Sequence, residues 1–380
     1  MNVTYMTGEE MPADPLLDVQ DLSVHFGAKA VVRGVHFSIA PGEKLALVGE
    51  SGSGKTITAL SLLRLAGDAK ISGKALLRGR DLLSLSEREM RGVRGGDIAM
   101  VFQEPMTALN PLMTIGQQIA EVLELKRALT TVQSAQAAIE LLAKTGIPEP
   151  ERRANSFPHQ LSGGQRQRAM IAMALASEPA LLLADEPTTA LDVTLRGQIL
   201  DLLSDLQRQS GMAVLLITHD LNLVRRFADR VAVMEQGVLV EQGRVAEVFR
   251  APQHPYTQRL MASQPRRDVV EQAPAAGTPL VLQTEALRVA YPTPLPGLRG
   301  WFKKGEFVAV QGASLQLLAG QTLGVVGESG SGKSTLAQAI LGLLPYGGQL
   351  TVAGQGWQQP AARNTPANQQ LRRRVQVVFQ

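Results

Sequence analysis

The sequence predicts an α/β fold in which short parallel strands alternate with helices, and the first part of this fold is expected twice. Short apolar runs such as Ala180–Ala184 and Ala213–Ile217 are typical of parallel strands that are buried on both faces. Helix-compatible stretches such as Val193–Gln209 separate these runs. The pattern that opens at Leu17 restarts at Val281, which indicates an internal repeat of a whole domain.

Composition limits the class of protein. A chain of 380 residues is long enough for two or three domains, each with its own core. It contains no cysteine, which excludes disulfides, cysteine-based zinc sites and a thiol nucleophile. Residues Met1–Glu10 lack the basic and apolar regions of a secretory signal, and no apolar run approaches the roughly 18 residues that span a bilayer. We therefore expect a soluble protein that associates with a membrane only through a partner.

Charge is unevenly distributed along the chain. The net charge is +4, yet residues 281–380 hold nine Lys and Arg against three Asp and Glu. A basic segment can indicate nucleic-acid binding. The run Arg372–Arg374 has no interleaved aromatic residues, however, and a solvated face is the alternative explanation. We expect no nucleic-acid partner.

Strands are expected at the start of the chain. Leu17–Phe26 and Val31–Ile39 have strand-like patterns, and Pro41 and Gly42 mark a turn before the strand Lys44–Val48. After a helix over Ile57–Leu65, a small antiparallel layer follows. The remaining strands of this layer and of the parallel sheet are predicted at Ile71–Leu77, Ile98–Phe102, Ala180–Ala184 and Ala213–Ile217.

Helical periodicity dominates between Thr114 and Thr145, and Pro148 and Pro150 are expected to close this region. Further helices are predicted at Arg168–Ser177 and Val193–Gln209, and short strands over Val231–Arg250.

These patterns divide the chain into a first domain at 15–264, a Pro- and Ala-rich linker at 265–280 and a partial second domain at 281–380. Gly320–Val326 and Arg374–Gln380 repeat two strand predictions of the first copy, and a helix is expected over Thr335–Leu344. The second copy stops well before the first one does, so we expect a chain that is truncated within its second domain.

An eight-residue loop follows an apolar run in each copy. Gly49–Thr56 and Gly327–Ser334 both satisfy G-x-x-x-x-G-K-[ST], the phosphate-binding loop or P-loop. Its glycines let backbone N–H groups turn toward phosphates, and the following helix adds its positive N-terminal end. The lysine reaches the terminal phosphates, and the hydroxyl of Thr56 or Ser334 binds Mg²⁺. The predicted nucleotide-binding residues of the loops are Gly49, Ser51, Gly52, Ser53, Gly54, Lys55 and Thr56, and Gly327, Ser329, Gly330, Ser331, Gly332, Lys333, Ser334 and Thr335.

Two carboxylates, Asp185 and Glu186, end a predicted apolar strand. A buried parallel strand would direct Asp185 to the mouth of the P-loop, where it can hold Mg²⁺, usually through water. Glu186 is then placed to polarise the water that attacks the γ-phosphate.

The segment Leu161–Gln165 (LSGGQ) precedes a predicted helix. Its hydroxyl and glycines at a helix N-terminus could form a second anion site. A plain N-cap is the alternative, because serine is common before helices.

With the P-loop, Gln103, the Asp–Glu pair, Ala190–Asp192 and His219 in this order, the chain resembles an ATP-binding-cassette (ABC) ATPase over about residues 15–380. The resemblance implies the P-loop NTPase fold, with an antiparallel β subdomain and a helical subdomain, followed by the N-terminal part of a second such cassette. It also implies ATP and Mg²⁺ as cofactors.

The resemblance assigns roles to residues of the first copy. Glu186 is the implied general base, His219 the switch that contacts the γ-phosphate, and Gln103 the sensor of Mg²⁺ and attacking water. Phe26 resembles the aromatic that stacks on adenine, although a place in the strand core is the alternative. The resemblance also implies that four residues contact the nucleotide bound to the opposite protomer: Ser162, Gly163, Gly164 and Gln165. It implies that Asp192 contacts nucleotide as well. The residues implied to contact Mg²⁺ are Thr56, Gln103, Asp185, Ser334 and Gln380.

The segments His254–Thr257 and Val101–Pro111 resemble the dipeptide/oligopeptide importer subclass, which includes fused two-cassette ATPases for microcin C-like peptides. The resemblance implies an ATP-binding and ATP-hydrolysing subunit that powers import of peptides or similar small solutes. It implies membrane permease subunits and a second cassette as partners, a solute-binding protein indirectly, and a peripheral place on the cytoplasmic face of the inner membrane. The alternatives are a soluble tandem ABC protein acting on the ribosome or DNA, and a nucleotide-binding fragment with little activity.

Overall fold

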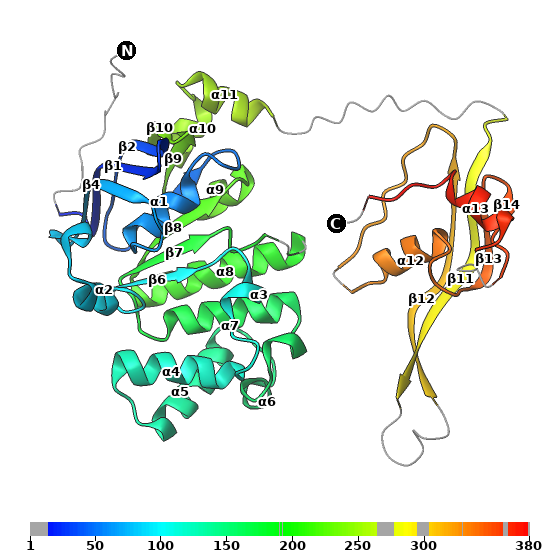
Figure 1. Cartoon of the computed structure of the whole chain (residues 1–380), viewed down its shortest axis with the longest axis horizontal. Coiled ribbons are helices and arrows are strands. Elements are labelled where there is room, and N and C mark those ends of the chain that lie inside the picture. The colour runs from blue at the N-terminus through cyan, green and yellow to red at the C-terminus, as the bar shows by residue number, and fades with distance from the viewer. Residues whose placement is uncertain are drawn as a thin grey trace. The chain divides into compact units, whose positions relative to one another are not determined.

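The computed structural model describes residues 14–189, 191, 193–263, 277–294, 304–328, 330–359 and 364–378. The chain forms two compact units, within residues 1–266 and 267–380 (Figure 1). Most of the predicted linker lies outside the described residues, as do three predicted site residues: Asp192, Ser329 and Gln380.

A six-stranded sheet forms the centre of the first unit (Figure 1). The five strands from β9 to β6 are parallel, and β10 adds an antiparallel edge. Strands β7 and β8 are buried along their full length, which confirms the prediction from their apolar sequences. The order across the sheet is β10 (Val238–Arg244), β9 (Arg230–Glu235), β3 (Lys44–Val48), β8 (Ala213–Thr218), β7 (Leu181–Asp185) and β6 (Ile98–Val101).

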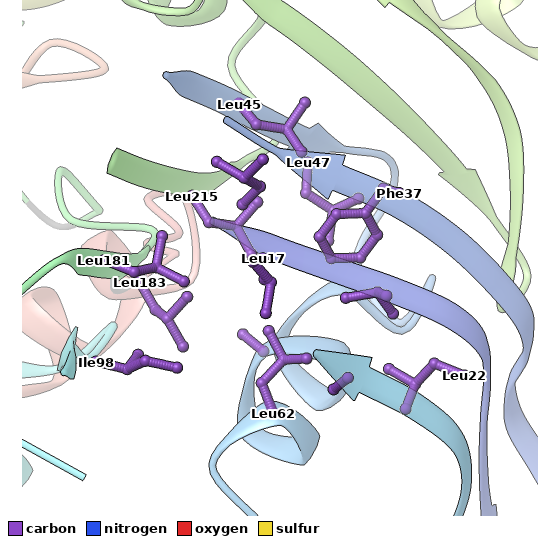
Figure 2. Packing of buried hydrophobic residues seen from close by; sticks show 14 of the residues in the cluster. Leu17, Leu22, Phe37, Leu45, Leu47, Leu62, Ile98, Leu181, Leu183 and Leu215 are labelled. Carbon is purple, nitrogen blue, oxygen red and sulfur yellow. The ribbon is translucent and has the colours of Figure 1, made fainter. Parts of the chain in front are cut away.

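An antiparallel sheet packs against the same core. Leu17 of this sheet, Leu47 of β3 and Leu62 of helix α1 (Lys55–Leu62) belong to one fully buried cluster (Figure 2). Because burying a leucine contributes about 1.5–3 kcal/mol, this cluster fixes the strand before the P-loop and the helix after it. The sheet order is β2 (Lys29–Ile39), β1 (Leu17–Phe26), β4 (Lys70–Leu77) and β5 (Arg80–Asp81).

Helices α4 and α5 lie in the region predicted to be helical, and the side chains of Thr114 and Thr130 cap their N-termini. Helix α5 ends at Lys144, close to the predicted end of this region at Thr145. Pro150, however, begins a further helix, because proline fits the first helical turn. The helices of the first unit are α1, α2 (Glu87–Val93), α3 (Pro105–Ala108), α4 (Ile115–Arg127), α5 (Thr131–Lys144), α6 (Pro150–Ala154), α7 (Gly163–Leu175), α8 (Val193–Ser210), α9 (Leu221–Phe227), α10 (Val245–Arg250) and α11 (Pro255–Ala262), with 3₁₀ turns at Leu82–Ser84 and Pro158–Gln160.

Two other boundaries differ from the sequence prediction. Helix α7 begins five residues before Arg168, because the Ser162 side chain caps it at that point. The predicted strands over Val231–Arg250 end at Arg244, and the last six residues form α10.

The second unit contains a four-stranded antiparallel sheet and two described helices, α12 (Lys333–Ile340) and α13 (Pro366–Arg372). Leu287, Leu336 and Trp357 lie in its core. The sheet order is β12 (Lys304–Leu318), β11 (Leu280–Pro294), β13 (Gly347–Val352) and β14 (Gln355–Gly356).

The strand predictions at Gly320–Val326 and Arg374–Gln380 are wrong for the described residues, which form no strand there. Val326 and Val378 are 92% and 98% exposed. In the first unit, β3 pairs with both β8 and β9, and β6 pairs with β7. The described part of the second unit has no counterpart of these partner strands, and without partners the backbone groups of a strand cannot form its ladder.

Across the described ranges, no helix is both long enough and apolar enough to cross a membrane.

Candidate functional site

The predicted site segments of the first unit meet at one edge of the central sheet. β3 leads into the P-loop, β6 into Gln103, β7 into Asp185 and Glu186, and β8 into His219. Because these four strands are parallel, their carboxyl ends lie on the same side, where ligands of open α/β sheets bind. The topology therefore gathers residues that are up to 170 positions apart in the sequence.

The P-loop of the first unit is closed around its lysine. Lys55 Nζ donates hydrogen bonds to the carbonyl oxygens of Gly49 (2.8 Å) and Glu50 (2.7 Å), and lies 3.3 Å from Ser53 Oγ. Lys55 is only 5% exposed, and this burial lowers its pKa, although Glu186 and Asp185 act in the opposite direction. The loop thus holds a buried cation with neutral oxygens, a setting in which an anionic ligand would be attracted strongly.

Only glycine fits at position 49, for both steric and conformational reasons. Its φ is +151°, and a Cβ atom at this position would lie 2.2 Å from the carbonyl oxygen of Met234 on β9. The P-loop therefore packs directly on the backbone of a neighbouring strand.

Thr56 and Asp185 provide an oxygen pair suited to Mg²⁺. Thr56 Oγ1 donates a hydrogen bond to Asp185 Oδ1 at 3.1 Å. Mg²⁺ prefers oxygen ligands and takes few of them from the protein, the rest coming from phosphates and water. Among the described residues, no cluster of three or more His, Cys, Asp or Glu side chains could hold a metal ion by itself. Burial raises the pKa of Asp185 to about 6, so a bound cation would also offset the cost of its charge.

Glu186 lies at the centre of a hydrogen-bonded group. His219 Nδ1 lies 3.0 Å from its Oε1, while Gln103 Nε2 (3.3 Å) and Thr189 Oγ1 (2.8 Å) donate to its Oε2. Burial acts to raise the pKa of Glu186, but the hydrogen bonds from His219 and Thr189 outweigh it, and the pKa is lowered. Glu186 is therefore an ionised carboxylate at neutral pH, as a general base must be.

The backbone of Glu186 is strained. Its φ is +44°, which is uncommon for a residue with a side chain. The Glu186 amide donates to Ile217 O of β8 at 2.9 Å, which helps to hold this conformation. Such strain is typical of functional positions.

The sequence predicted Gln103, Glu186 and His219 as site residues, and the structure adds Thr189 to this group. Thr189 lies in the turn after Glu186, where its amide donates to the Glu186 carbonyl at 3.1 Å. The sequence does contain a sign of this contact, because Thr189 lies three residues after the predicted base. A turn over these residues brings the threonine hydroxyl next to the carboxylate.

The segment Ser162–Gln165 forms a capping box: Ser162 Oγ accepts from the Gln165 amide (3.3 Å), and Gln165 Oε1 accepts from the Ser162 amide (3.1 Å). The N-cap interpretation is confirmed, and the second anion site stays a prediction. Ser162 and Gly163 are exposed, whereas Gly164 is buried. Among the described hydrogen bonds, none joins this segment to the P-loop of the same unit.

Phe26 ends β1 and is 38% exposed, so its ring is not enclosed in the strand core. The following strand β2 passes close to the P-loop, since a Cβ on Gly54 would lie 3.0 Å from Val31 O. Stacking of Phe26 on adenine stays a prediction.

The second P-loop reproduces the contacts of the first. Lys333 Nζ donates to Gly327 O (2.7 Å) and Glu328 O (2.6 Å) and lies 3.4 Å from Ser331 Oγ. This geometry therefore depends on the local sequence and does not need a surrounding parallel sheet.

Comparison with known proteins shows two family matches. Residues 32–189 and 310–380 match the ABC transporter family, and residues 240–286 match the oligopeptide/dipeptide transporter C-terminal region.

Two relatives match nearly the whole chain. One is the peptidoglycan transport ATP-binding protein YejF of Agrobacterium fabrum, 51% identical over 379 residues. Another is the glutathione import ATP-binding protein GsiA of Escherichia coli, 44% identical over 407 residues. The matches cover 98% of this chain but 68% and 65% of the two relatives, so the chain spans about two thirds of their length.

Solved structures of similar fold include a dimeric ATP-binding cassette in a post-hydrolysis state with ADP and Pi, with a TM-score of 0.55 and 30% identity over 60% of this chain and 98% of the cassette. A second is cbiO1 of Clostridium perfringens, part of the ABC transporter complex cbiONQ, with a TM-score of 0.55 and 29% identity over 62% of this chain and 91% of that protein.

Proposed function

The chain belongs to the ABC transporter family of ATP-binding proteins, and we propose that it is the ATP-hydrolysing subunit of an importer of peptides or similar small solutes. The match of residues 240–286 to the oligopeptide/dipeptide transporter region supports this solute class. The relatives named for glutathione import and peptidoglycan transport support it as well. They favour import over the alternative of a soluble tandem protein acting on the ribosome or DNA.

The hydrogen-bonded group around Glu186, beside the P-loop, carries the proposal. The phosphates of ATP would lie against the loop amides and the Lys55 ammonium. Mg²⁺ held by Thr56 and Asp185 would neutralise charge on the phosphates. Glu186 accepts a proton from the attacking water, and His219 and Gln103 hold its carboxylate in position.

We also propose that two cassettes combine to complete each site. The family match in two separate segments supports a two-cassette chain. Ser162 and Gly163 are exposed at the N-terminus of α7, where nucleotide bound to another cassette can reach them. In this arrangement membrane permease subunits hold the cassettes at the cytoplasmic face of the inner membrane, and a solute-binding protein delivers solute to the permease.

Pairing can be tested by the concentration dependence of hydrolysis. If first units must pair, the steady-state ATPase rate of the isolated chain rises with the square of its concentration at low concentration. A high rate that is simply proportional to protein concentration would refute the pairing.

The catalytic assignment is tested by Glu186→Gln, which keeps the shape of the side chain but removes the base. We expect ATPase activity to fall by roughly 10²–10⁴-fold while MgATP still binds. Glu140→Gln, at an exposed position on α5, is the matched control and should retain full activity. Near-normal hydrolysis by Glu186→Gln would exclude Glu186 as the base.

A further inference from the structure

The segment His254–Thr257 has no part in the site described so far. It begins helix α11, with Pro255 in the first turn and with His254 Nδ1 accepting a hydrogen bond from the Tyr256 amide at 3.2 Å. Glu241 of β10 accepts from the backbone amides of Gln253 (2.8 Å) and His254 (3.1 Å). These contacts fix the backbone at the start of α11 and therefore the direction of the Tyr256 side chain.

Tyr256 is 4% exposed and belongs to the apolar cluster that contains Val48, the last residue of β3. The Arg259 guanidinium lies 5.8 Å from the centre of its ring and is itself paired with Glu235 at 3.1 Å. The Tyr256 hydroxyl accepts a hydrogen bond of 2.9 Å from the backbone amide of Glu50, which is 206 residues earlier in the P-loop.

This amide belongs to a peptide group that is held at both ends. Its N–H, on Glu50, donates to the Tyr256 hydroxyl, and its carbonyl, on Gly49, accepts from Lys55 Nζ at 2.8 Å. A peptide group is planar and rigid, so rotation at one end moves the other. The phenol of Tyr256 is therefore linked to the Lys55 ammonium through a single rigid plane.

We propose that Tyr256 is a positioning residue for nucleotide binding, whose hydroxyl fixes the Gly49–Glu50 peptide and thereby the Lys55 ammonium. The proposal rests on the proposed function, since it assigns Lys55 to the phosphates of ATP. The second P-loop provides an internal comparison. Lys333 makes the same contacts, but among the described hydrogen bonds none has the Glu328 amide donating to a side chain. Tyr256 thus adds a restraint to a turn that the local sequence already forms.

The first test is Tyr256→Phe in the full chain, combined with Lys333→Ala so that binding at the first loop is measured. A hydrogen bond with a net contribution of about 0.5–1.5 kcal/mol corresponds to an increase of about 2- to 12-fold in the Kd for MgATP, measured by calorimetric titration. Tyr346→Phe is the matched control: it removes a tyrosine hydroxyl that is hydrogen-bonded to Gln359 in the second unit, and the Kd should not change.

The outcomes separate this proposal from the proposed function. An unchanged Kd in Tyr256→Phe, with MgATP binding intact, would overturn the positioning role and leave the ATPase assignment standing. A wild-type chain that does not bind MgATP would overturn both.

Amide hydrogen exchange at Glu50, compared with other protected amides of the first unit, gives a second readout of this hydrogen bond. In the wild-type chain we expect the Glu50 amide to exchange more slowly than the Glu328 amide, and this difference should shrink in Tyr256→Phe. Equal protection of the Glu50 amide in both chains would contradict the proposal.

If Tyr256→Phe does not fold, the proposal can be tested instead on the wild-type chain labelled with 3-fluorotyrosine. The chain has four tyrosines, so the ¹⁹F signal of Tyr256 is assigned by replacing the other three. We expect this signal to shift when MgATP binds, because the phenol and the phosphate site share one peptide plane. A signal that does not respond to MgATP would overturn the proposal.

Discussion

Replacing Asp185 by asparagine should stabilise the metal-free first unit while abolishing its activity. Asp185 is 2% exposed, and this burial raises its pKa from 3.8 to about 6, although the Thr56 hydrogen bond opposes the shift. Asparagine has nearly the same shape, retains an oxygen that can accept from Thr56, and carries no charge. It therefore removes the cost of a buried carboxylate but also removes an oxygen that we assign to Mg²⁺.

The sign and size of the effect follow from the pKa. A carboxyl whose pKa is raised by folding keeps its proton in the folded state at a pH where the unfolded chain has lost it. The wild-type chain therefore loses stability as the pH rises from about 4 to about 6, and above that the loss is constant. The difference between the pKa of Asp185 in the folded chain and its ordinary value corresponds to about 3 kcal/mol in the free energy of unfolding. The advantage of Asp185→Asn should grow by about 2 kcal/mol between pH 4.5 and pH 8.

Urea unfolding in EDTA without nucleotide, at several pH values, measures this difference. Asp68→Asn, at an exposed position in the same unit, is the matched control and should follow the wild-type chain. The reasoning would be refuted if Asp185→Asn were no more stable than the wild-type chain at pH 8, or if its advantage did not grow with pH. ATPase activity in MgATP should be lost in the same variant, which would separate stability from function.

Two further predictions concern the same site. Thr189→Val removes a hydrogen bond that lowers the pKa of Glu186, so the acid limb of kcat/KM against pH should move to higher pH; an unmoved limb would show that Thr189 does not act on the base. Gly49→Ala places a Cβ 2.2 Å from Met234 O and should abolish MgATP binding and lower stability by about 1–3 kcal/mol. Gly67→Ala, also at positive φ but with nothing within 4 Å, is its control in thermal unfolding and should still bind MgATP.

Much of the first unit follows from its sequence pattern. β3, β7 and β8 lie within one or two residues of their predicted bounds, because continuous apolar runs flanked by turn residues leave few alternatives. The helix predicted at Arg168–Ser177 starts five residues earlier, at the point where Ser162 was predicted, as one of two alternatives, to be an N-cap. The strand predictions near Val326 and Val378 failed because a strand needs partner strands, and an apolar run does not say whether they are present.

The candidate site was also predictable from the sequence only in part. The order of motifs along the chain predicted Lys55, Asp185, Glu186 and His219, since each has a suitable chemical type and a place after a predicted strand. Their convergence is a consequence of the parallel sheet, because the carboxyl ends of its strands meet at one edge. The pKa of Asp185 and the strained backbone of Glu186 arise only in the folded environment.

By itself, the sequence determined that two phosphate-binding loops are present and how each holds its lysine, because those contacts lie within six residues of chain. Only the tertiary structure decided that Thr56 of the first loop bonds to Asp185 and that its Glu50 amide bonds to a tyrosine 206 residues away. The physical reason is the range of the interactions: a turn is set by local backbone conformation, whereas burial, strand pairing and long-range hydrogen bonds depend on which distant segments fold against it.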